Sequence, residues 1–371
     1  MNYKVFTSES VAAGHPDKIC DQVSDALLDA TLLTDPKARA GIEVLVTTNH
    51  LTIAGEVKIK NGARINYKQI ARGVIKQLGY TNSRFGFDTE AKIDVLVHEQ
   101  NQEIADGVDI GGAGDQGMMF GYAVKETPTL MPLPITLAHE LVKKLDEVRE
   151  GRTIPYLRPD GKSEVTMEYK NGNPVSLERV VLAACHSEEV KNIQLKEDLY
   201  KFVVTPALNK FNLKVERKNL IVNGEGIWIT PGPATDTGVT GRKVIVDSYG
   251  AYGRAGGGCF SGKDPTKVDR SGAYAARYIA KNIVAAGLAD KVEIQIAYVI
   301  GQPQPIAKDI ETFGTEKKPP RIIKDFAWNL LDLSVSGIIK GLDLQRPIYR
   351  KTAAYGHFGR NRFPWESIKN F

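Results

Sequence analysis

Apolar and polar positions change period along the chain, and these changes divide it into a repeated order of elements. From Glu43 to Val57 the pattern is that of two strands, with a break near Asn49–His50 that predicts a turn between them. A helical period follows from about Tyr67 to Leu78, and an apolar run from Lys92 to Val97 predicts a further strand. This stretch therefore predicts a β-β-α-β unit.

Two later stretches repeat this order. The second predicts a hairpin around Asn171–Gly172, a helix near Glu197 to Asn209, and strands at Ile221 and Trp228–Ile229. The third predicts a strand from Lys243 to Asp247, a helix from Asp269 to Ala286, and a strand from Val292 to Val299. Each unit also has one long additional helix, expected at 17–33, 133–149 and 325–340. We therefore expect an α/β (α+β) fold of three similar domains, each a mixed or mostly antiparallel sheet covered by helices.

The expected domain boundaries follow from these units. We place an N-terminal domain at 1–98, a central domain at 112–231 and a C-terminal domain at 233–371. Residues 99–111 lie between the first two, and the glycine density from Gly107 to Gly121 is typical of a hinge or the base of a lid. The polar run from His98 to Asp106 would be that lid, and a plain linker is the alternative.

Composition narrows the class of protein. The chain has 371 residues, 42% apolar and 25% charged, which is ordinary for a globular protein of two or three domains. A net charge of +5 is too balanced to make nucleic-acid binding the first hypothesis. No apolar run approaches the length of a membrane span, and the start of the chain lacks a signal-like segment, so we expect no membrane insertion. Three cysteines without close spacing predict neither a disulfide framework nor a zinc site, and favour the cytoplasm.

The stretch from Tyr249 to Arg270 is the strongest candidate for chemistry. It has six glycines between Gly250 and Gly262, followed by cationic Lys263 and Lys267 and then by the N-terminus of a helix. Glycines let backbone N–H groups approach a ligand, and a helix N-terminus attracts anions, so this pattern predicts a polyphosphate site. Two alternatives are a P-loop, in which Asp264 would replace the usual Ser or Thr, and a flexible solvated loop.

The corner at the start of the first helix also carries chemistry. Pro16 suits the first turn of a helix that runs to about Leu33, and Asp17 lies beside His15 at a loop-to-helix corner, where a carboxylate could hold Mg²⁺. Aspartates recur every fourth residue after it, and like charges at this spacing repel unless a cation compensates them. We interpret Asp21 through Asp29 as a solvated face. Two polar turns, 158–163 and 236–243, place a carboxylate near cations, although either alone is typical of a surface turn.

Together these motifs resemble the S-adenosylmethionine synthetase (methionine adenosyltransferase) family over nearly the whole chain. The motifs are Gly-His-Pro-Asp-Lys at 14–18, Gly-Ala-Gly-Asp-Gln-Gly at 112–117, Gly-Gly-Gly-Cys-Phe-Ser-Gly-Lys-Asp at 256–264, and the C-terminal Thr-Ala-Ala-Tyr-Gly-His-Phe-Gly at 352–359. The resemblance implies three similar domains around a pseudo-three-fold axis. It also implies that the protein joins ATP to L-methionine, releases tripolyphosphate and hydrolyses it to phosphate and pyrophosphate.

The resemblance implies a role for individual residues. The implied catalytic residues are His15, Lys162, Arg242 and Lys263, and the implied ATP contacts add Asp115, Asp160, Trp228, Asp236, Lys243 and Cys259. The implied methionine contacts are Glu56, Gln100, Asp236 and Lys267. Implied metal ligands are Asp17 and Asp269 for Mg²⁺, with two ions per site, and Glu43 for K⁺. A homodimer with active sites at its interface, possibly a dimer of dimers, is implied as well.

Some positions depart from the family pattern. Trp228 stands where Phe is usual, Pro231 begins a Pro-Gly-Pro in place of Gly-Gly-Pro, and Ala13 and Thr237 replace a common acidic residue and a frequent Cys. The 98–111 loop is also short. Adenine packing and lid motion are the properties these departures affect. Two other function classes stay open at this point: a P-loop-like ATPase or kinase, and a non-catalytic nucleotide-binding regulator or scaffold.

Overall fold

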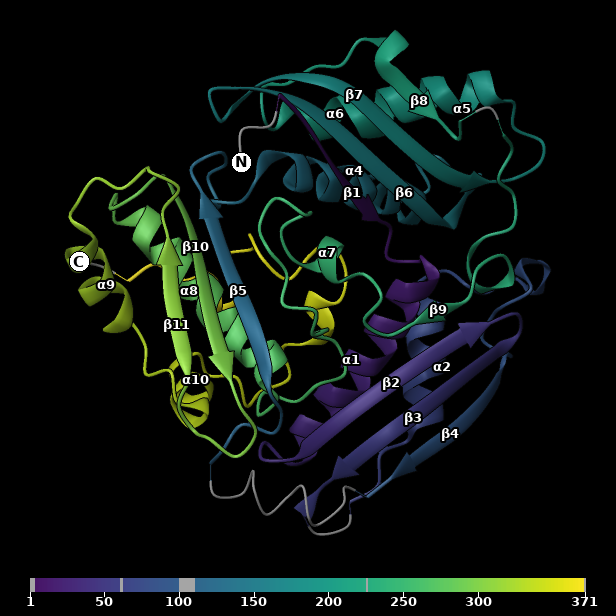
Figure 1. Ribbon diagram of the computed structural model, residues 1–371. Coiled ribbons are helices and arrows are strands. Elements are labelled where there is room, and N and C mark those ends of the chain that lie inside the picture. The colour runs from purple at the N-terminus through teal and green to yellow at the C-terminus, as the bar shows by residue number, and fades with distance from the viewer. Residues whose placement is uncertain (1–3, 61–62, 100–110, 225, 370–371) are drawn as a thin grey trace.

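Three separate sheets surround a common centre in the computed structural model, which describes residues 4–60, 63–99, 111–224 and 226–369. Figure 1 shows the sheets as three lobes, with the short helix α7 (Val244–Asp247) between them. Each lobe combines strands with helices, which confirms the expected α/β class and the three domains. Within the described residues, no helix is both long enough and apolar enough to cross a bilayer.

The first sheet contains the unit predicted between residues 43 and 97. Its strand order is β4-β3-β2-β9, with bounds β2 Arg39–Thr47, β3 His50–Lys58, β4 Lys92–His98 and β9 Gly238–Val239. Strands β2 and β3 form the expected hairpin, in which Asn49 has a φ of 50°, and β4 runs parallel to β3. Helices α1 (Pro16–Thr34) and α2 (Tyr67–Gln77) lie beside this sheet (Figure 1).

The second sheet has the order β1-β6-β7-β8. Its strands are β1 Val5–Val11, β6 Leu157–Lys170, β7 Asn173–His186 and β8 Leu220–Val222. The predicted hairpin turn is confirmed, because Asn171 and Gly172 have φ of 52° and 78°, as a two-residue turn between twisted strands requires. The helices of this lobe are α4 Leu133–Glu150, α5 Asn192–Leu199 and α6 Thr205–Asn209, the last two joined by a π-helical turn, Tyr200–Val204.

The third sheet, ordered β11-β10-β5, corrects the predicted third unit. Its strands are β5 Gly117–Val124, β10 Lys291–Tyr298 and β11 Ala307–Glu311. The run from Lys243 to Asp247, predicted as a strand, forms helix α7 instead, and β5 lies beside β10. The apolar run at 244–246 has only three positions, which are too few to distinguish the two periods. Helix α8 (Val268–Ala285) covers the sheet, and a Cβ at Gly121 of β5 would lie 2.0 Å from the Ala276 backbone.

Two further expectations from the sequence are wrong. The helix expected at 325–340 is divided into α9 (Pro320–Trp328) and α10 (Val335–Gly341). A new helix starts at α10 because the Ser334 hydroxyl accepts a hydrogen bond from Gly337 N–H and caps it. Trp228–Ile229 forms no strand, although Trp228 O accepts a hydrogen bond from His186 N–H. The expected lid between His98 and Asp106 lies almost wholly outside the described residues.

Each sheet contains a strand from another part of the sequence. Strand β1 pairs with β6 of the central part, β5 pairs with β10 of the C-terminal part, and β9 pairs with β2 of the N-terminal part. Helices α1 and α4 are the additional helices predicted for the first and second units. Helix α8 is the helix predicted within the third unit. The lobes are therefore connected by shared strands as well as by packing.

Candidate functional site

The N-terminus of α1 is built from the Gly-His-Pro-Asp motif, as the sequence predicts. His15 is the N-cap residue, and its Nδ1 accepts a hydrogen bond from Asp17 N–H at 3.2 Å. Burial and the nearby Lys243 ammonium lower the pKa of His15 to about 3, so the imidazole is neutral at pH 7. Because Nδ1 is the acceptor, the proton of the neutral ring is on Nε2. The ring can thus donate a hydrogen bond without carrying a charge.

Asp17 connects this corner to the polar turn at 236–243. Its carboxylate contacts Lys243 Nζ at 2.5 Å and Arg242 Nε at 3.2 Å, and it accepts from Val239 N–H at 3.0 Å. Burial acts to raise the pKa of Asp17, but the Lys243 hydrogen bond and the Val239 N–H outweigh it and lower the pKa. Asp17 is therefore held ionised although its side chain is fully buried.

The other polar turn, 158–163, packs against the same corner. A Cβ at Gly14 would lie 1.5 Å from Pro159 O, so only glycine permits this approach. Lys162 is exposed and is among the charges that lower the pKa of His15. Asp160 Oδ2 accepts from Gly232 N–H at 2.8 Å, whereas its Oδ1 is buried without a partner among the described residues. Burial raises the pKa of Asp160 to about 8, so this carboxyl is largely protonated at neutral pH.

These residues form the first of two groups, which we call the α1 cluster. Its members are His15, Asp17, Asp160, Lys162, Arg242 and Lys243. Three of the four sequence-predicted catalytic residues belong to it. The arrangement surrounds a neutral hydrogen-bond donor with cations, which suits an anionic ligand.

The glycine-rich loop forms the second group, the loop cluster, against β2. Lys263 pairs with Asp269 in the first turn of α8, and Gly258 lies so close to Asp269 that a Cβ would be 2.4 Å from its carboxyl carbon. At Gly262, which has a φ of 81°, a Cβ would be 1.9 Å from Ile42 O. Cys259 lies between the groups, since a Cβ at Gly241 would be 2.5 Å from the Cys259 Cβ. Burial raises the pKa of the Cys259 thiol, so it is no ready nucleophile.

Both alternatives for this loop are wrong. The segment before it is helix α7 rather than the strand that a P-loop requires. Asp264 is fully buried, accepts from Ala40 N–H at 2.8 Å and pairs with Lys267 at 3.0 Å, so its carboxylate fixes the loop to β2. A flexible solvated loop is excluded too, because Phe260, Ser261 and Asp264 are buried.

Predicted methionine contacts are only partly brought together. Glu56 and Lys267 both approach the open side of Gly41, where a Cβ would lie 2.7 Å from Glu56 Oε1 and 3.3 Å from Lys267 Cε. These two belong to the loop cluster. Asp236 is exposed, with no side-chain hydrogen bond or ion pair within the described ranges, and Gln100 lies outside the described residues.

The remaining predicted residues form no hydrogen bond or ion pair with a member of either cluster in the described part of the chain. Glu43 is exposed on β2, and Asp115 is exposed with its Oδ1 accepting from Gln116 N–H at 2.7 Å. Trp228 is half-buried, and its Nε1–H donates to Thr230 O at 2.9 Å, just before the Gly232 that binds Asp160. The described chain contains no group of three or more His, Cys, Asp or Glu side chains suited to a metal. Asp17 and Asp269 therefore belong to no such group.

The aspartates that follow Asp17 were missed by sequence reasoning. The predicted solvated face is wrong, because Asp21 and Asp25 are fully buried. Asp21 accepts from Gly241 N–H at 2.8 Å and Asp25 accepts from Gly262 N–H at 2.8 Å. Asp29 accepts from Tyr349 N–H and Arg350 N–H, both at 2.9 Å. One face of α1 therefore holds the turn of the α1 cluster, the glycine-rich loop and the C-terminal segment in succession.

Cations compensate the buried aspartates. Lys18, itself fully buried, pairs with Asp21 at 2.9 Å and with Asp247 of α7. Arg270 of α8 pairs with Asp25 at 2.7 Å. The only signal in the sequence was the four-residue spacing itself, whose repulsion required such partners.

Comparison with known proteins agrees with this architecture. Family models for the N-terminal, central and C-terminal domains of S-adenosylmethionine synthetase match residues 3–102, 110–228 and 230–367. Three similar proteins, each named S-adenosylmethionine synthase, come from Clostridium tetani (48% identical, covering 98% of this chain and 97% of its own), a Parafrankia species (48%; 99% and 97%) and Corynebacterium urealyticum (49%; 99% and 97%). The chain therefore belongs to the S-adenosylmethionine synthetase family.

Proposed function

We propose that this protein forms S-adenosyl-L-methionine from ATP and L-methionine in two steps. The methionine sulfur attacks the ribose 5′ carbon and tripolyphosphate leaves, and the tripolyphosphate is then hydrolysed to phosphate and pyrophosphate. The observation that carries the proposal is the α1 cluster, in which Arg242 and Lys243 contact Asp17 beside a neutral His15. A thioether has no proton to lose, so the first step needs no general base. It needs alignment and stabilisation of the charge that develops on the leaving group.

The neutral state of His15 suits that demand. An Nε2–H donor can hydrogen-bond the bridging oxygen as it gains charge, while Asp17 N–H holds the ring through Nδ1. We assign Lys162, Arg242, Lys243 and Lys263 to the polyphosphate. Asp160, being protonated, can donate a hydrogen bond from its unpartnered side to ATP. The proposed ATP contacts also include Asp115, Trp228, Asp236 and the backbone near Cys259.

Methionine would lie at the loop cluster. Glu56 and Lys267 offer one charge of each sign beside Gly41, which matches the ammonium and carboxylate of an amino acid. Gln100 and Asp236 complete the proposed contacts. Lys263 pairs with Asp269, so a bound anion would compete with that carboxylate for the lysine.

The expected cations fit the carboxylates as partial sites. Mg²⁺ is usually held by one or two carboxylates together with substrate phosphates and water, so the single Asp17 and Asp269 suit one ion each. Asp17 faces Lys243, whose hydrogen bond favours the ionised form that binds metal, and Asp269 pairs with Lys263. When bound, Mg²⁺ would neutralise charge on the phosphate oxygens. Glu43 is the proposed K⁺ ligand.

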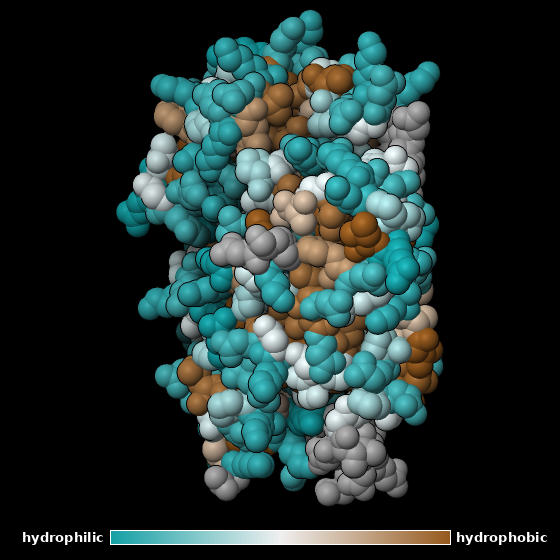
Figure 2. Space-filling model, turned by 90° about the vertical axis from the view of Figure 1, so that its left-hand side faces the viewer, coloured by the Kyte–Doolittle hydropathy of each residue, from teal (hydrophilic) through white to brown (hydrophobic). Residues whose placement is uncertain are grey.

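A homodimer, or a tetramer made of two such dimers, is proposed because large apolar residues are exposed on the surface. Each sheet exposes a large apolar residue on a strand: Val5 on β1, Leu45 on β2, Leu96 on β4 and Met118 on β5 are 40–64% exposed. Figure 2 shows one side of the molecule on which apolar residues gather near the middle, with hydrophilic residues around them. Apolar areas rimmed by polar residues are typical of protein interfaces. Location in the cytoplasm remains a prediction.

Product analysis tests the function. The protein is incubated with ATP, L-methionine, Mg²⁺ and K⁺, and products are identified by mass spectrometry, with a second reaction lacking methionine. We expect S-adenosylmethionine, phosphate and pyrophosphate only when methionine is present. ADP formed without methionine would instead indicate an ATPase or kinase, and no turnover in either reaction would indicate a non-catalytic nucleotide-binding protein.

A further inference from the structure

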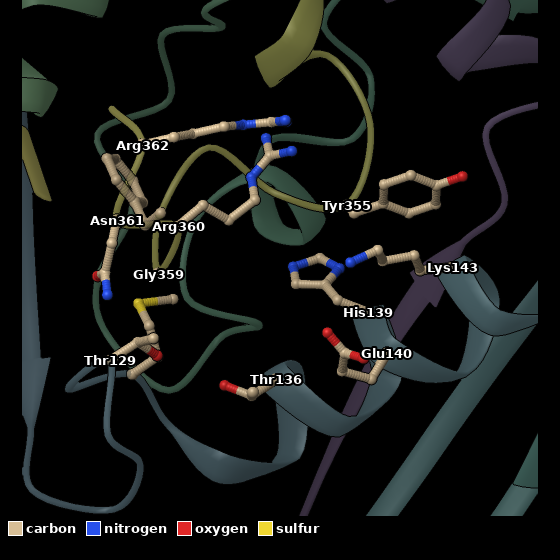
Figure 3. A pocket seen from close by; sticks show the side chains of 12 residues that line it. Thr129, Thr136, His139, Glu140, Lys143, Tyr355, Gly359, Arg360, Asn361 and Arg362 are labelled. Carbon is tan, nitrogen blue, oxygen red and sulfur yellow. The ribbon is translucent and has the colours of Figure 1, made fainter. Parts of the chain in front are cut away.

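A cavity of about 500 Å³ lies outside both clusters, between helix α4 and the C-terminal segment. Thr136, His139, Glu140 and Lys143 line it from α4, and Tyr355 and residues 358–362 line it from the C-terminal segment (Figure 3). A cavity of this volume can enclose a small organic molecule. None of its lining residues has a role in the proposed reaction.

Most of the charged residues that line this cavity are cationic. Arg360 and Arg362 extend from the C-terminal segment with their guanidinium groups close together, and Lys143 extends from α4 (Figure 3). Lys143 and Arg362 form no ion pair with a carboxylate in the described part of the chain. Glu140 is the acidic residue of the lining, and Lys210 Nζ already pairs with it at 2.6 Å. The lining is therefore cationic on balance, and its carboxylate, Glu140, is already paired with Lys210.

The state of Arg360 supports this reading. Burial and the neighbouring Arg362 lower the pKa of Arg360 to about 10, and its Nη2 donates to Thr352 O and Gly356 O. Arg360 Nε–H has no acceptor among the described residues. His139 adds no charge, because burial and Arg360 lower its pKa to about 3. An arrangement of this kind is stabilised when an anion binds.

The geometry points to a binding site for a phosphorylated small molecule in this cavity, with Arg360, Arg362 and Lys143 around the phosphate. Guanidinium groups bind phosphate through paired N–H donors. Two guanidinium groups and one ammonium therefore suit a phosphate dianion as ligand better than they suit a singly charged carboxylate. The cavity is larger than inorganic phosphate needs, and Met131 and Phe358 give it an apolar wall. A phosphomonoester with an apolar group should therefore bind more tightly than inorganic phosphate.

The site is connected to the glycine-rich loop. His357 lies beside Phe358, and its Nδ1 lies 2.8 Å from Tyr274 Oη, while the Tyr274 hydroxyl accepts from Arg270 Nε at 3.0 Å. Arg270 pairs with the same Asp25 that binds Gly262 N–H. Occupation of the cavity should consequently stabilise the folded protein as a whole.

Binding of phenyl phosphate and of inorganic phosphate, measured by titration calorimetry on the purified full chain, tests the site. We expect phenyl phosphate to bind at least about tenfold more weakly to Arg362→Gln and to Lys143→Gln than to the wild type. Lys144→Gln is the matched control, because Lys144 is on the same helix but pairs with Glu147 at 3.1 Å outside the cavity. Thermal melts of each variant confirm that it is folded.

Lys263→Ala separates this site from the proposed active site. We expect it to retain phenyl phosphate binding even if the proposed reaction is wrong, because Lys263 does not line the cavity. Equal binding by wild type, Arg362→Gln and Lys143→Gln would overturn the proposal, as would the absence of binding to the wild type. Loss of binding in Lys263→Ala alone would place the ligand in the loop cluster and would also overturn it. Tighter binding of inorganic phosphate than of phenyl phosphate would contradict the apolar wall.

Discussion

Asp25 and Arg270 form a two-point ion pair in the interior of the protein. Arg270 Nη1 donates to Asp25 Oδ1 at 2.7 Å and Nη2 donates to Oδ2 at 2.9 Å, with both side chains fully buried. Oδ1 also accepts from Gly262 N–H at 2.8 Å. The pair therefore joins α1 to α8, which lie on different sheets, and fixes the glycine-rich loop to both.

Asp25→Ala should lower the free energy of unfolding by about 3–5 kcal/mol, because it leaves the Arg270 charge buried and unpaired. Urea unfolding followed by circular dichroism measures this loss. Glu147→Ala is the control: its partner Lys144 is at the surface, so the change should be within about 1 kcal/mol. If Asp25→Ala were no more destabilising than this control, the pair would not have the structural role described.

Asp160→Asn should make stability depend less on pH. Burial raises the pKa of Asp160 in the folded protein to about 8, against an ordinary value of 3.8. Between these pH values the folded state binds a proton that the unfolded state has lost, so the contribution of Asp160 to stability decreases as pH rises from about 4 to about 8.

Thermal melts of wild type and Asp160→Asn from pH 5 to pH 8 provide the test, with pH values chosen to lie in that window. Asparagine does not titrate, so the difference in melting temperature should shift in favour of the variant as pH rises. Asp309→Asn, at an exposed position on β11, is the control and should leave the pH dependence unchanged. Parallel curves for wild type and Asp160→Asn would rule out a raised pKa at Asp160.

Lys263→Ala should lower kcat of the proposed reaction about 10²–10³-fold, since one preorganised contact to developing charge is lost. The side chain of Lys263 is 23% accessible and pairs with Asp269. A moderate loss of stability should accompany the loss of turnover. Steady-state kinetics are compared with Lys317→Ala, which removes an exposed ion pair with Asp290. Near wild-type kcat in Lys263→Ala would remove Lys263 from the proposed polyphosphate contacts.

Trp228→Ala should weaken ATP binding and leave methionine affinity nearly unchanged, whereas Trp228→Phe should keep most activity. A half-exposed indole offers a face on which adenine can stack, worth about 1–3 kcal/mol per base in nucleic-acid sites. The Nε1–H bond to Thr230 O holds the ring in place. Nucleotide titration by tryptophan fluorescence is run beside a thermal melt of both variants. A lower melting temperature with unchanged ATP affinity would indicate a purely structural tryptophan.

Sequence reasoning found the elements whose period is long and regular. Helices α1, α4 and α8 extend over 18 or 19 residues, and their predicted ranges differ from the observed ones by a few residues. The residues of the α1 cluster could also be predicted from the sequence, because they are in short distinctive motifs. The prediction of a single helix at 325–340 was wrong, because the capping residue Ser334 starts a new helix within an apolar pattern.

Partners distant in sequence could not be predicted. Whether Asp25 faces water or Arg270 depends on a contact across 245 positions, and a periodic pattern carries no information about it. The same holds for the segment 243–247, whose apolar residues are compatible with strand or helix. The sheet position that it was expected to fill is occupied by β5, which comes from 117–124.

The exchange of strands among the three sheets has a consequence for how the chain folds during synthesis and how it unfolds. The last strand of each sheet to emerge from the ribosome is β8 at 220–222, β9 at 238–239 or β11 at 307–311, so no sheet is complete until more than half of the chain has been synthesised. Fragments cut at the domain boundaries would each lose an edge strand to another fragment. Such long-range closure favours late, cooperative folding, and it makes partial opening of one lobe disturb its neighbours.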